Sequence, residues 1–277
     1  MQTETALAHR PISAAGMDRL PICQQEGQRV SEVLFESRDG LAVITLNRPA
    51  KLNSLTVEMF QELLVHVERI EKSPEEFGVV LLRGAGKCFS AGHDLGQINE
   101  GESLPFPNFQ PLIVERLANM PPPLVVAVHS HCYTGALELA LAGDIILASE
   151  NAKFADTHGK WGMSPLWGMS QRLPRRIGPA KAAEMMFTAA TIPGPEAERI
   201  GLANTCFPDA SFEAEVEAFC QSILANSWFS HKANKRLMID TDGMPLSSGL
   251  AHEVFHHPGV DPDMHQRIAK FLRKSGD

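Results

Sequence analysis

The stretch PLVVAVHSHCYTGALELALAGDIILAS, residues 123–149, holds two apolar runs on either side of a segment that contains glycine. Residues 123–130 and 144–149 are rich in apolar and β-branched side chains, as is typical of strands buried on both faces of a sheet. Between them, residues 134–142 have helical character. A strand, a helix and a second strand in this order predict an α/β architecture with crossover connections.

The alternation of strands and helices continues toward the N-terminus. VVLLRG, residues 79–84, predicts another buried strand. Segments with helical character at 93–99 and 109–119 lie between this run and the stretch quoted above. The alternation is therefore sustained over the middle of the chain and favours one α/β core.

Two short strands, VSEVLFES and LAVITL, are predicted further upstream, joined at Asp39-Gly40, a favourable hairpin turn. The segment after them, LTVEMFQELLVHVERIEKS, has the apolar spacing of an amphipathic helix. Ser54 and Thr56 are both candidates for its N-terminal cap, because a hydroxyl oxygen there can accept a hydrogen bond from a free backbone N–H.

The pattern becomes almost wholly helical beyond Phe207. Four helices are predicted, at 211–226, 229–239, 246–256 and 262–273. Residues 1–29 are polar and lack sustained periodicity, so we interpret them as a flexible extension. The predicted organisation is an extension at 1–29, an α/β core at 30–208 and a helical region at 209–277.

Composition excludes several classes of protein. The formal net charge of the 277 residues is −8, which argues against binding nucleic acid through an overall positive field. Five cysteines are scattered without a CxxC spacing, which is typical of reduced thiols and not of a disulfide framework. No run reaches the apolar length of a membrane span, and the first residues lack the apolar core of a secretion signal. We expect a cytoplasmic protein with neither nucleic acid nor membrane as a partner.

Two loops that contain glycine carry the strongest chemical signal: RGAGKCFSAGHDLGQI, residues 83–98, and HSHCYTGALELALAGD, residues 129–144. Each places a turn of small residues between a buried strand and a helix. The first N–H groups of a helix lack intrahelical partners and lie at the positive end of its dipole. Two such junctions that face each other would form an oxyanion hole. Taken singly, Gly86, Gly92 and Gly135 could simply form tight turns, and neither loop matches a phosphate-binding motif.

Four segments, in this order and spacing, resemble the enoyl-CoA hydratase/isomerase (crotonase) family: LNRPAKLNSL at 46–55, CFSAGHDL at 88–95, TGALELALAGDI at 134–145 and SPLWGMSQRLPRRIGPAKAAEMMFT at 164–188. The resemblance covers about residues 30 to 208. It implies a spiral of ββα units followed by a C-terminal helical region used in trimerisation, and hence a homotrimer or a dimer of trimers.

The resemblance also implies how an acyl-CoA substrate is held. The thioester oxygen would accept hydrogen bonds from the backbone N–H groups of His93 and Gly135, and the coenzyme A would lie against the two loops at 49–55 and 91–95. The candidate coenzyme A contacts are Arg48, Lys51, Leu52, Ala91, His93, Asp94 and Leu95. Arg48 or Lys51 would pair with phosphate, although either could equally be an ordinary exposed charge. The substrate carries coenzyme A, and neither a prosthetic group nor a metal is implied.

Glu138 is the first candidate for proton transfer. It follows Gly135 by three residues, so the two share one face of a helix. In the family this position holds a catalytic carboxylate. A glutamate within so apolar a helix should be desolvated, which raises its pKa and suits acid–base chemistry. The alternative is a structural glutamate in an ion pair.

The sequence departs from the family at the second carboxylate of the two-glutamate hydratases. Alignment of FADTHGKWGMSP, residues 154–165, places His158 at that position, with Asp156 as another possible substitute. Histidine can donate or accept a proton near neutral pH, so a Glu138/His158 pair could serve both proton transfers. A purely structural His158 remains open. His129 and His131 replace the usual Asn-Gly before the second loop, and we interpret them as packing residues.

The predicted function is that of an enoyl-CoA hydratase, a lyase of fatty acid metabolism that adds water reversibly to a 2-enoyl-CoA. Three alternatives stay open: an acyl-CoA isomerase, a hydrolase of the thioester or of a C–C bond, and a crotonase-like scaffold without activity. HEVFH, residues 252–256, matches the HExxH zinc motif, but it lies in the helical region and Pro258-Gly259 ends its helix. We interpret it as a polar face at a subunit interface.

Overall fold

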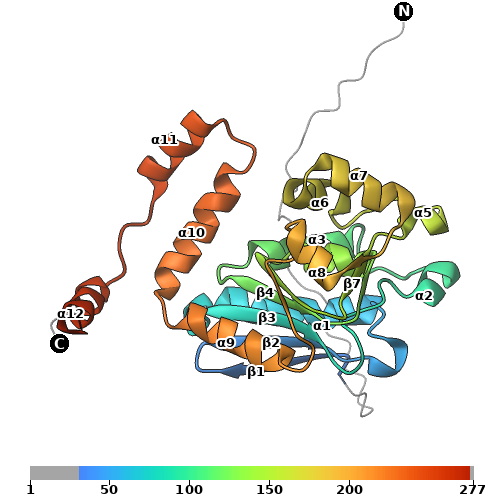
Figure 1. Cartoon of the computed structure of the whole chain (residues 1–277), viewed down its shortest axis with the longest axis horizontal. Helices are drawn as coiled ribbons and strands as arrows, with labels where there is room; N and C mark the ends of the chain where they lie inside the picture. The colour runs from blue at the N-terminus through green and yellow to red at the C-terminus, as the bar shows by residue number, and fades with distance from the viewer. Residues whose placement is uncertain (1–30, 275–277) are drawn as a thin grey trace, which may run out of the picture. The chain divides into compact units, whose positions relative to one another are not determined.

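The computed structural model describes residues 31–274 of the chain, so the predicted extension at 1–29 lies outside the described residues. Six strands form the main sheet, in the order β1 (Val33–Arg38), β2 (Leu41–Leu46), β3 (Val79–Gly84), β4 (Leu124–Val128), β6 (Ile145–Ser149) and β9 (Thr205–Phe207) (Figure 1). β1 and β2 are antiparallel, whereas each later strand is parallel to its neighbour. The five strands predicted from the quoted runs and the hairpin are therefore present where the sequence placed them, as β1, β2, β3, β4 and β6.

The hairpin and the helix after it follow from local sequence. Asp39 and Gly40 have positive φ angles of 47° and 85° and form a two-residue turn that pairs Arg38 with Leu41. Helix α1 (Val57–Lys72) is capped by Thr56, whose hydroxyl oxygen accepts a hydrogen bond from the Met59 N–H at 3.2 Å. Of the two predicted caps, Thr56 is thus the one that the structure uses.

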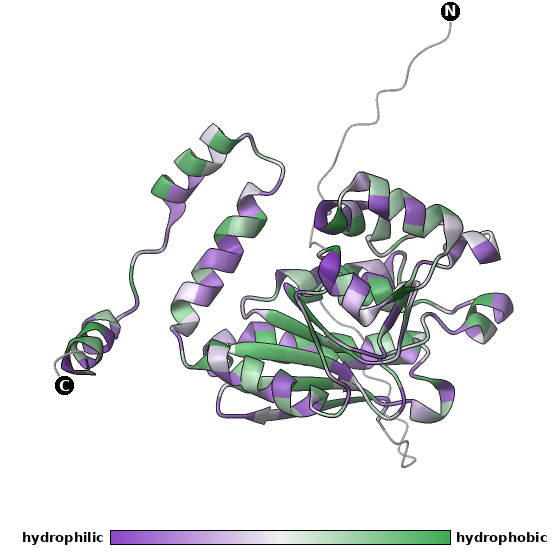
Figure 2. Cartoon of the chain, viewed as in Figure 1, coloured by the Kyte–Doolittle hydropathy of each residue, from purple (hydrophilic) through white to green (hydrophobic). Residues whose placement is uncertain are grey.

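The central strands of the main sheet are hydrophobic along most of their length (Figure 2), and their side chains divide between two cores. Val80 and Leu82 of β3 belong to the larger core, where they join residues of α1 and of α3 (Phe109–Asn119). Val79 and Leu81 belong to a second core with residues of α9 (Phe212–Leu224). Helices on both faces explain why these strands are apolar at every position.

A second, smaller sheet gives the fold its spiral. It contains β5 (His131–Tyr133), β7 (Lys153–Ala155) and β8 (Ile192–Pro193). The chain passes from β4 to β5 and then into helix α4 (Gly135–Ala140), and it repeats this path from β6 through β7 into α5 (His158–Trp161). These repeated ββα units confirm the predicted fold class.

The remaining elements complete the core and the C-terminal region. The short helices are α2 (Leu95–Glu100), α8 (Gly194–Arg199) and the 3-10 turns η1 (Pro49–Lys51) and η2 (Pro74–Glu76), and the longer ones are α6 (Met169–Ile177), α7 (Pro179–Thr188), α10 (Trp228–Thr241), α11 (Leu246–His256) and α12 (Met264–Lys274). α9 to α12 are the four helices expected beyond Phe207. Within residues 31–274, no helix has the length and apolar character needed to cross a bilayer.

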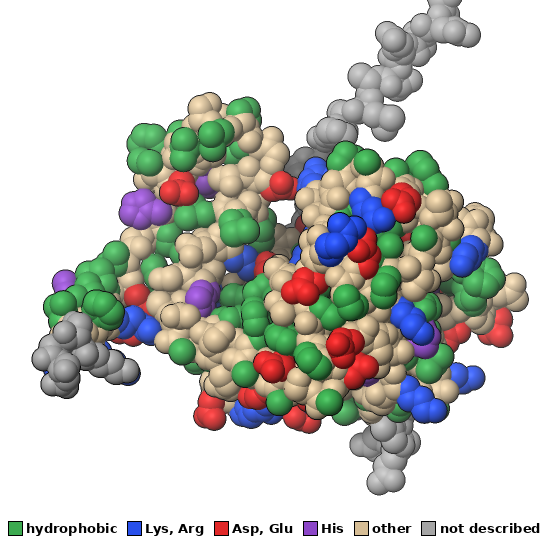
Figure 3. Space-filling view, viewed as in Figure 1, with side chains coloured by type: hydrophobic (Ala, Val, Ile, Leu, Met, Phe, Trp, Pro, Cys, Tyr) green, Lys and Arg blue, Asp and Glu red, His purple; other side chains and the backbone are tan. Residues whose placement is uncertain are grey.

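Helix α10 is fastened to the core by a buried lysine. Lys235 Nζ lies 2.8 Å from Asp144 Oδ2 and donates to the Pro122 carbonyl at 3.1 Å. Helix α11, by contrast, leaves large apolar side chains exposed (Figure 3): Leu246, Leu250, Val254 and Phe255. The helical region therefore combines a fixed first part with an apolar surface further along.

Candidate active site

The two loops that contain glycine meet in the structure. The Ser90 N–H donates to the His131 carbonyl at 2.9 Å, so the first loop extends the small sheet beside β5. Gly92 has a φ of 103°, and a Cβ there would lie 2.6 Å from the Tyr133 carbonyl oxygen and 3.8 Å from the Gly135 nitrogen. Only glycine allows the loops to approach this closely.

Each loop leaves one main-chain amide available. Gly135 begins α4, directly after Thr134, whose φ of 53° and ψ of −110° turn the chain into the helix. His93 lies in a bridge with Leu55 in which the Gly92 carbonyl and the Asp94 N–H make the hydrogen bonds. Across the described part of the chain, neither the His93 N–H nor the Gly135 N–H has a protein acceptor. Both residues line a cavity of about 240 Å³.

Glu138 also lines this cavity, and its carboxylate is held by backbone amides. Its Oε1 accepts hydrogen bonds from the Trp167 N–H at 2.8 Å and the Met169 N–H at 3.0 Å. Its Oε2 lies 3.7 Å from His158 Nε2. Burial raises the pKa of Glu138, and this effect outweighs the opposing influence of the two N–H groups and of His158.

His158 lies in the same cavity lining and is oriented by Asp156. Asp156 Oδ1 accepts from the His158 backbone N–H at 3.1 Å and lies 2.6 Å from His158 Nδ1. The carboxylate therefore fixes a proton on Nδ1 and turns Nε2 toward Glu138. Burial lowers the pKa of His158, but the hydrogen bond and charge of Asp156 together with the charge of Glu138 outweigh it, and the pKa is raised.

The His93 side chain belongs to a second polar group in the cavity. His93 Nε2 lies 2.5 Å from Glu102 Oε1, and Gln110 Nε2 donates to the same oxygen at 3.1 Å. Trp167 packs beside His93, with ring centroids 4.8 Å apart. Trp167 thus contacts the imidazole of His93 with its ring and donates its backbone N–H to Glu138.

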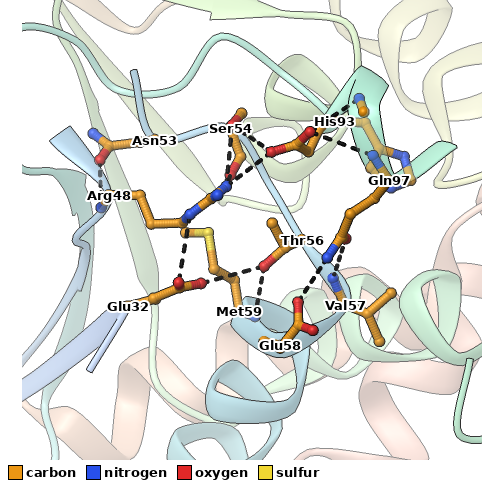
Figure 4. Close-up of polar contacts among 12 residues, drawn as sticks. Glu32, Arg48, Asn53, Ser54, Thr56, Val57, Glu58, Met59, His93 and Gln97 are labelled. Atoms are coloured by element: carbon orange, nitrogen blue, oxygen red, sulfur yellow. Dashed lines mark hydrogen bonds and ion pairs between the residues drawn. The ribbon is translucent and has the colours of Figure 1, made fainter. Parts of the chain in front are cut away.

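Arg48 is engaged in internal ion pairs. Its guanidinium donates to Asp94 Oδ2 at 3.1 Å and to Ser54, and it lies 3.5 Å from Glu32 Oε1 (Figure 4). Asp94 in turn caps α2 by accepting from the Gly96 N–H at 3.0 Å. Burial raises the pKa of Asp94, but its hydrogen bonds, those from Arg48 and Ser54 first, outweigh this and lower it. The structure therefore gives Arg48 a structural part, whereas Lys51 on η1 is exposed.

Apart from His93, the other predicted coenzyme A contacts lie on the loops at 49–55 and 91–95 and are not among the residues that line the cavity. The Ala91 N–H donates to the Leu52 carbonyl at 2.9 Å, which joins the 49–55 and 91–95 loops. Leu52 and Leu95 leave 40% and 43% of their surface exposed. These two apolar side chains and the exposed Lys51 are therefore accessible on the two joined loops.

Comparison with known proteins decides the family. The sequence profile of the enoyl-CoA hydratase/isomerase family matches residues 36–275. This chain belongs to that family. A probable enoyl-CoA hydratase, echA8, of Mycobacterium leprae is 33% identical over 87% of this chain and 95% of its own, and the probable peroxisomal enoyl-CoA hydratase 1 of Arabidopsis thaliana is 31% identical over 90% and 96%. The crystal structure of an enoyl-CoA hydratase from Bacillus anthracis has a TM-score of 0.81 at 26% identity, over 88% of this chain and 97% of that one.

Sequence reasoning missed several residues of the site in this family member. The amides of Trp167 and Met169 lie on either side of Gly168, whose φ is 115°, at the start of α6. This is another turn with glycine before a helix, and that pattern was the available signal. Glu102 and Gln110 had no local signal, because their role depends on the His93 ring.

The remaining histidines lie apart from the cavity. His129 Nε2 lies 3.0 Å from the Gly86 carbonyl oxygen, and the His131 ring packs on Tyr133. His252 and His256 of the HExxH match stack on each other with ring centroids 4.1 Å apart. Among residues 31–274, no three His, Cys, Asp or Glu side chains are placed together to hold a metal ion.

Proposed function

We propose that this protein is an enoyl-CoA hydratase that adds water reversibly across the double bond of a 2-enoyl-CoA. One observation carries the proposal: His93, Gly135, Glu138 and His158 all line a single cavity of about 240 Å³. The relatives named above support it, as does the short-chain-enoyl-CoA hydratase of Clostridium acetobutylicum, which is 30% identical over 81% of this chain.

The free amides of His93 and Gly135 would bind the thioester oxygen. Negative charge develops on that oxygen when water attacks Cβ, because the electron pair of the double bond moves toward the carbonyl. Two N–H donors directed at this oxygen stabilise the charge, and one such donor is typically worth about 3 kcal/mol in the transition state.

Glu138 and His158 would then divide the two proton transfers. Glu138 takes a proton from the attacking water while the water oxygen adds to Cβ. Protonated His158 delivers a proton from Nε2 to Cα. The flanking carboxylates that raise the pKa of His158 keep it charged for this step. The raised pKa of Glu138 makes its carboxylate a stronger base.

The coenzyme A part and the assembly belong to the same proposal. Lys51, Leu52, Ala91, Asp94 and Leu95 would contact coenzyme A, with the Lys51 ammonium toward a phosphate and Arg48 holding the loop through Asp94. The exposed apolar residues of α11 support assembly as a homotrimer or a dimer of trimers. We place the enzyme in the cytoplasm, where the free cysteines of the core stay reduced.

Hydration can be followed directly. Crotonyl-CoA and longer 2-enoyl-CoAs should lose their enoyl absorbance, with a mass increase of one water in the product. A folded protein that binds coenzyme A but turns over no 2-enoyl-CoA would rule out the hydratase assignment.

Thioester hydrolysis is the second candidate, and the Asp156–His158 contact of 2.6 Å favours it. An imidazole oriented by a carboxylate is a common general base for water. His158 would deprotonate water that attacks the thioester carbon, and the same two amides would stabilise the oxyanion. Mass spectrometry separates the candidates, because hydrolysis releases free coenzyme A and an acid, whereas hydration retains the thioester.

A further inference from the structure

We infer that the acyl group of the substrate carries a hydroxyl group, and that Glu102 and Gln110 select it. The inference rests on the proposed function, because it concerns the acyl part of the same cavity. It begins from an unusual feature of the lining, which is a carboxylate and an amide among apolar side chains such as Ile98 and Leu104.

Gln110 is buried and Glu102 is partly buried. The Gln110 residue is 3% exposed, and the Glu102 side chain is 15% exposed. Burying polar groups is unfavourable unless they form hydrogen bonds. A purely aliphatic acyl group would displace water from these residues and offer nothing in return.

The hydrogen bonds already present indicate which kind of substrate group Glu102 and Gln110 can bind. Glu102 Oε1 accepts from His93 Nε2 and from Gln110 Nε2. Within residues 31–274, neither Glu102 Oε2 nor Gln110 Oε1 receives a hydrogen bond from another residue. Both atoms are acceptors, so the group that satisfies them is a donor. A substrate hydroxyl provides one, whereas a terminal carboxylate would be repelled by the charge of Glu102.

The size of the cavity suits a short acyl chain. Its volume of about 240 Å³ lies below the range of about 300 to 1,000 Å³ that is typical of sites for whole drug-sized ligands. A short 2-enoyl-CoA with a hydroxyl group near the end of its chain is therefore the substrate to test.

The test compares substrates of one chain length. Wild-type kcat/KM is measured for 2-hexenoyl-CoA, for its 5-hydroxy and 6-hydroxy derivatives, and for the six-carbon 2-enoyl-CoA with a terminal carboxylate. We expect the better hydroxylated substrate to exceed 2-hexenoyl-CoA by about tenfold or more, and the carboxylate to be the poorest. Equal values for the hydroxylated and unsubstituted substrates would overturn the inference.

Two variants assign the preference to the named residues. Glu102→Gln removes the charge and turns one acceptor into a donor, and Gln110→Met removes the amide with little change in volume. Each should lower the ratio between hydroxylated and unsubstituted substrates by about tenfold. Glu100→Gln is the matched control, because Glu100 is exposed, lies two residues before Glu102 and does not line the cavity, so this variant should leave the ratio unchanged. An unchanged ratio in both variants would contradict the assignment of the preference to Glu102 and Gln110.

Binding measurements separate this inference from the proposed function. Calorimetry with hexanoyl-CoA and 5-hydroxy- and 6-hydroxyhexanoyl-CoA requires no turnover. Tighter binding of a hydroxylated ligand that is lost in both variants supports the inference even if no enoyl-CoA is hydrated. Hydration of 2-hexenoyl-CoA without any preference, in turnover or in binding, would leave the hydratase proposal intact and refute the inference.

Discussion

Two carboxylate–histidine pairs lie at one cavity, which is lined by His158 of the first pair and by both residues of the second. Asp156 Oδ1 lies 2.6 Å from His158 Nδ1, and Glu102 Oε1 lies 2.5 Å from His93 Nε2. Their surroundings differ. The Asp156 side chain is 2% exposed and that of Glu102 is 15% exposed. The first pair faces Glu138, a second buried carboxylate, whereas the second pair faces the neutral amide of Gln110.

This difference indicates that the role of each pair depends on the side chain that it faces. Opposite Glu138, His158 can complete a proton transfer that needs one group to accept and another to donate. His93 faces no second acid, so its ring orders Glu102 and packs against Trp167. Substitutions in the two pairs should therefore have effects of very different size.

The largest effect is expected at Glu138, the buried carboxylate that the first pair faces. Glu138→Gln should lower kcat for crotonyl-CoA hydration by about 10³-fold, because the amide cannot take a proton from water. Its carbonyl oxygen can still accept from the Trp167 and Met169 amides, so the fold should persist. Glu215→Gln, at an exposed position of α9, is the control. Activity within tenfold of wild type would remove Glu138 from the mechanism.

The histidine of the first pair comes next. His158→Ala should reduce kcat by about 100-fold, since the proton for Cα must then come from water. His129→Ala provides the comparison, because His129 contacts the Gly86 carbonyl outside the cavity. A loss no greater than in His129→Ala would make His158 structural.

Asp156, the carboxylate of the first pair, should affect how kcat/KM depends on pH. Activity needs Glu138 ionised and His158 protonated, so kcat/KM should follow a bell whose acid limb reflects the raised pKa of Glu138 and whose alkaline limb reflects the raised pKa of His158. Asp156→Asn keeps an acceptor for Nδ1 but removes the charge that raises the pKa of His158. The alkaline limb should move to lower pH, and kcat at neutral pH should fall by about tenfold. An unmoved alkaline limb would refute this role of Asp156.

The smallest effect is expected in the second pair. His93→Ala keeps the main-chain N–H and loses only the ring and its bond to Glu102, so crotonyl-CoA hydration should fall by about fivefold, as for one ordinary hydrogen bond. The direct comparison is with His158→Ala under the same conditions. Equal losses in the two variants would mean that both pairs serve the same step.

Much of the fold was predictable because its signals are local. The apolar runs at 79–84 and 123–130 and the turn at Asp39-Gly40 specify backbone conformation within a few residues. The three strands of the small sheet were not predicted. With two or three residues each, they are too short for a periodic pattern, and they form only because the spiral brings them side by side.

The site divides in the same way. The family resemblance placed His93, Gly135, Glu138 and His158 in one site, and all four line the cavity. It also left open whether His158 or Asp156 replaces the second glutamate of the family. In the structure, Asp156 lies against Nδ1 of His158 and orients its ring.

By itself, the sequence determined the α/β core, the helical region after it, the family, and the residue types available for proton transfer, because periodicity, turn residues and motif order can all be read along the chain. Only the tertiary structure decided which groups meet. The Trp167 amide reaches Glu138 across 29 positions, and Glu102 and Gln110 reach one imidazole from different elements. Such contacts depend on how helices and loops pack together in space, and the order of residues along the chain does not specify that packing locally.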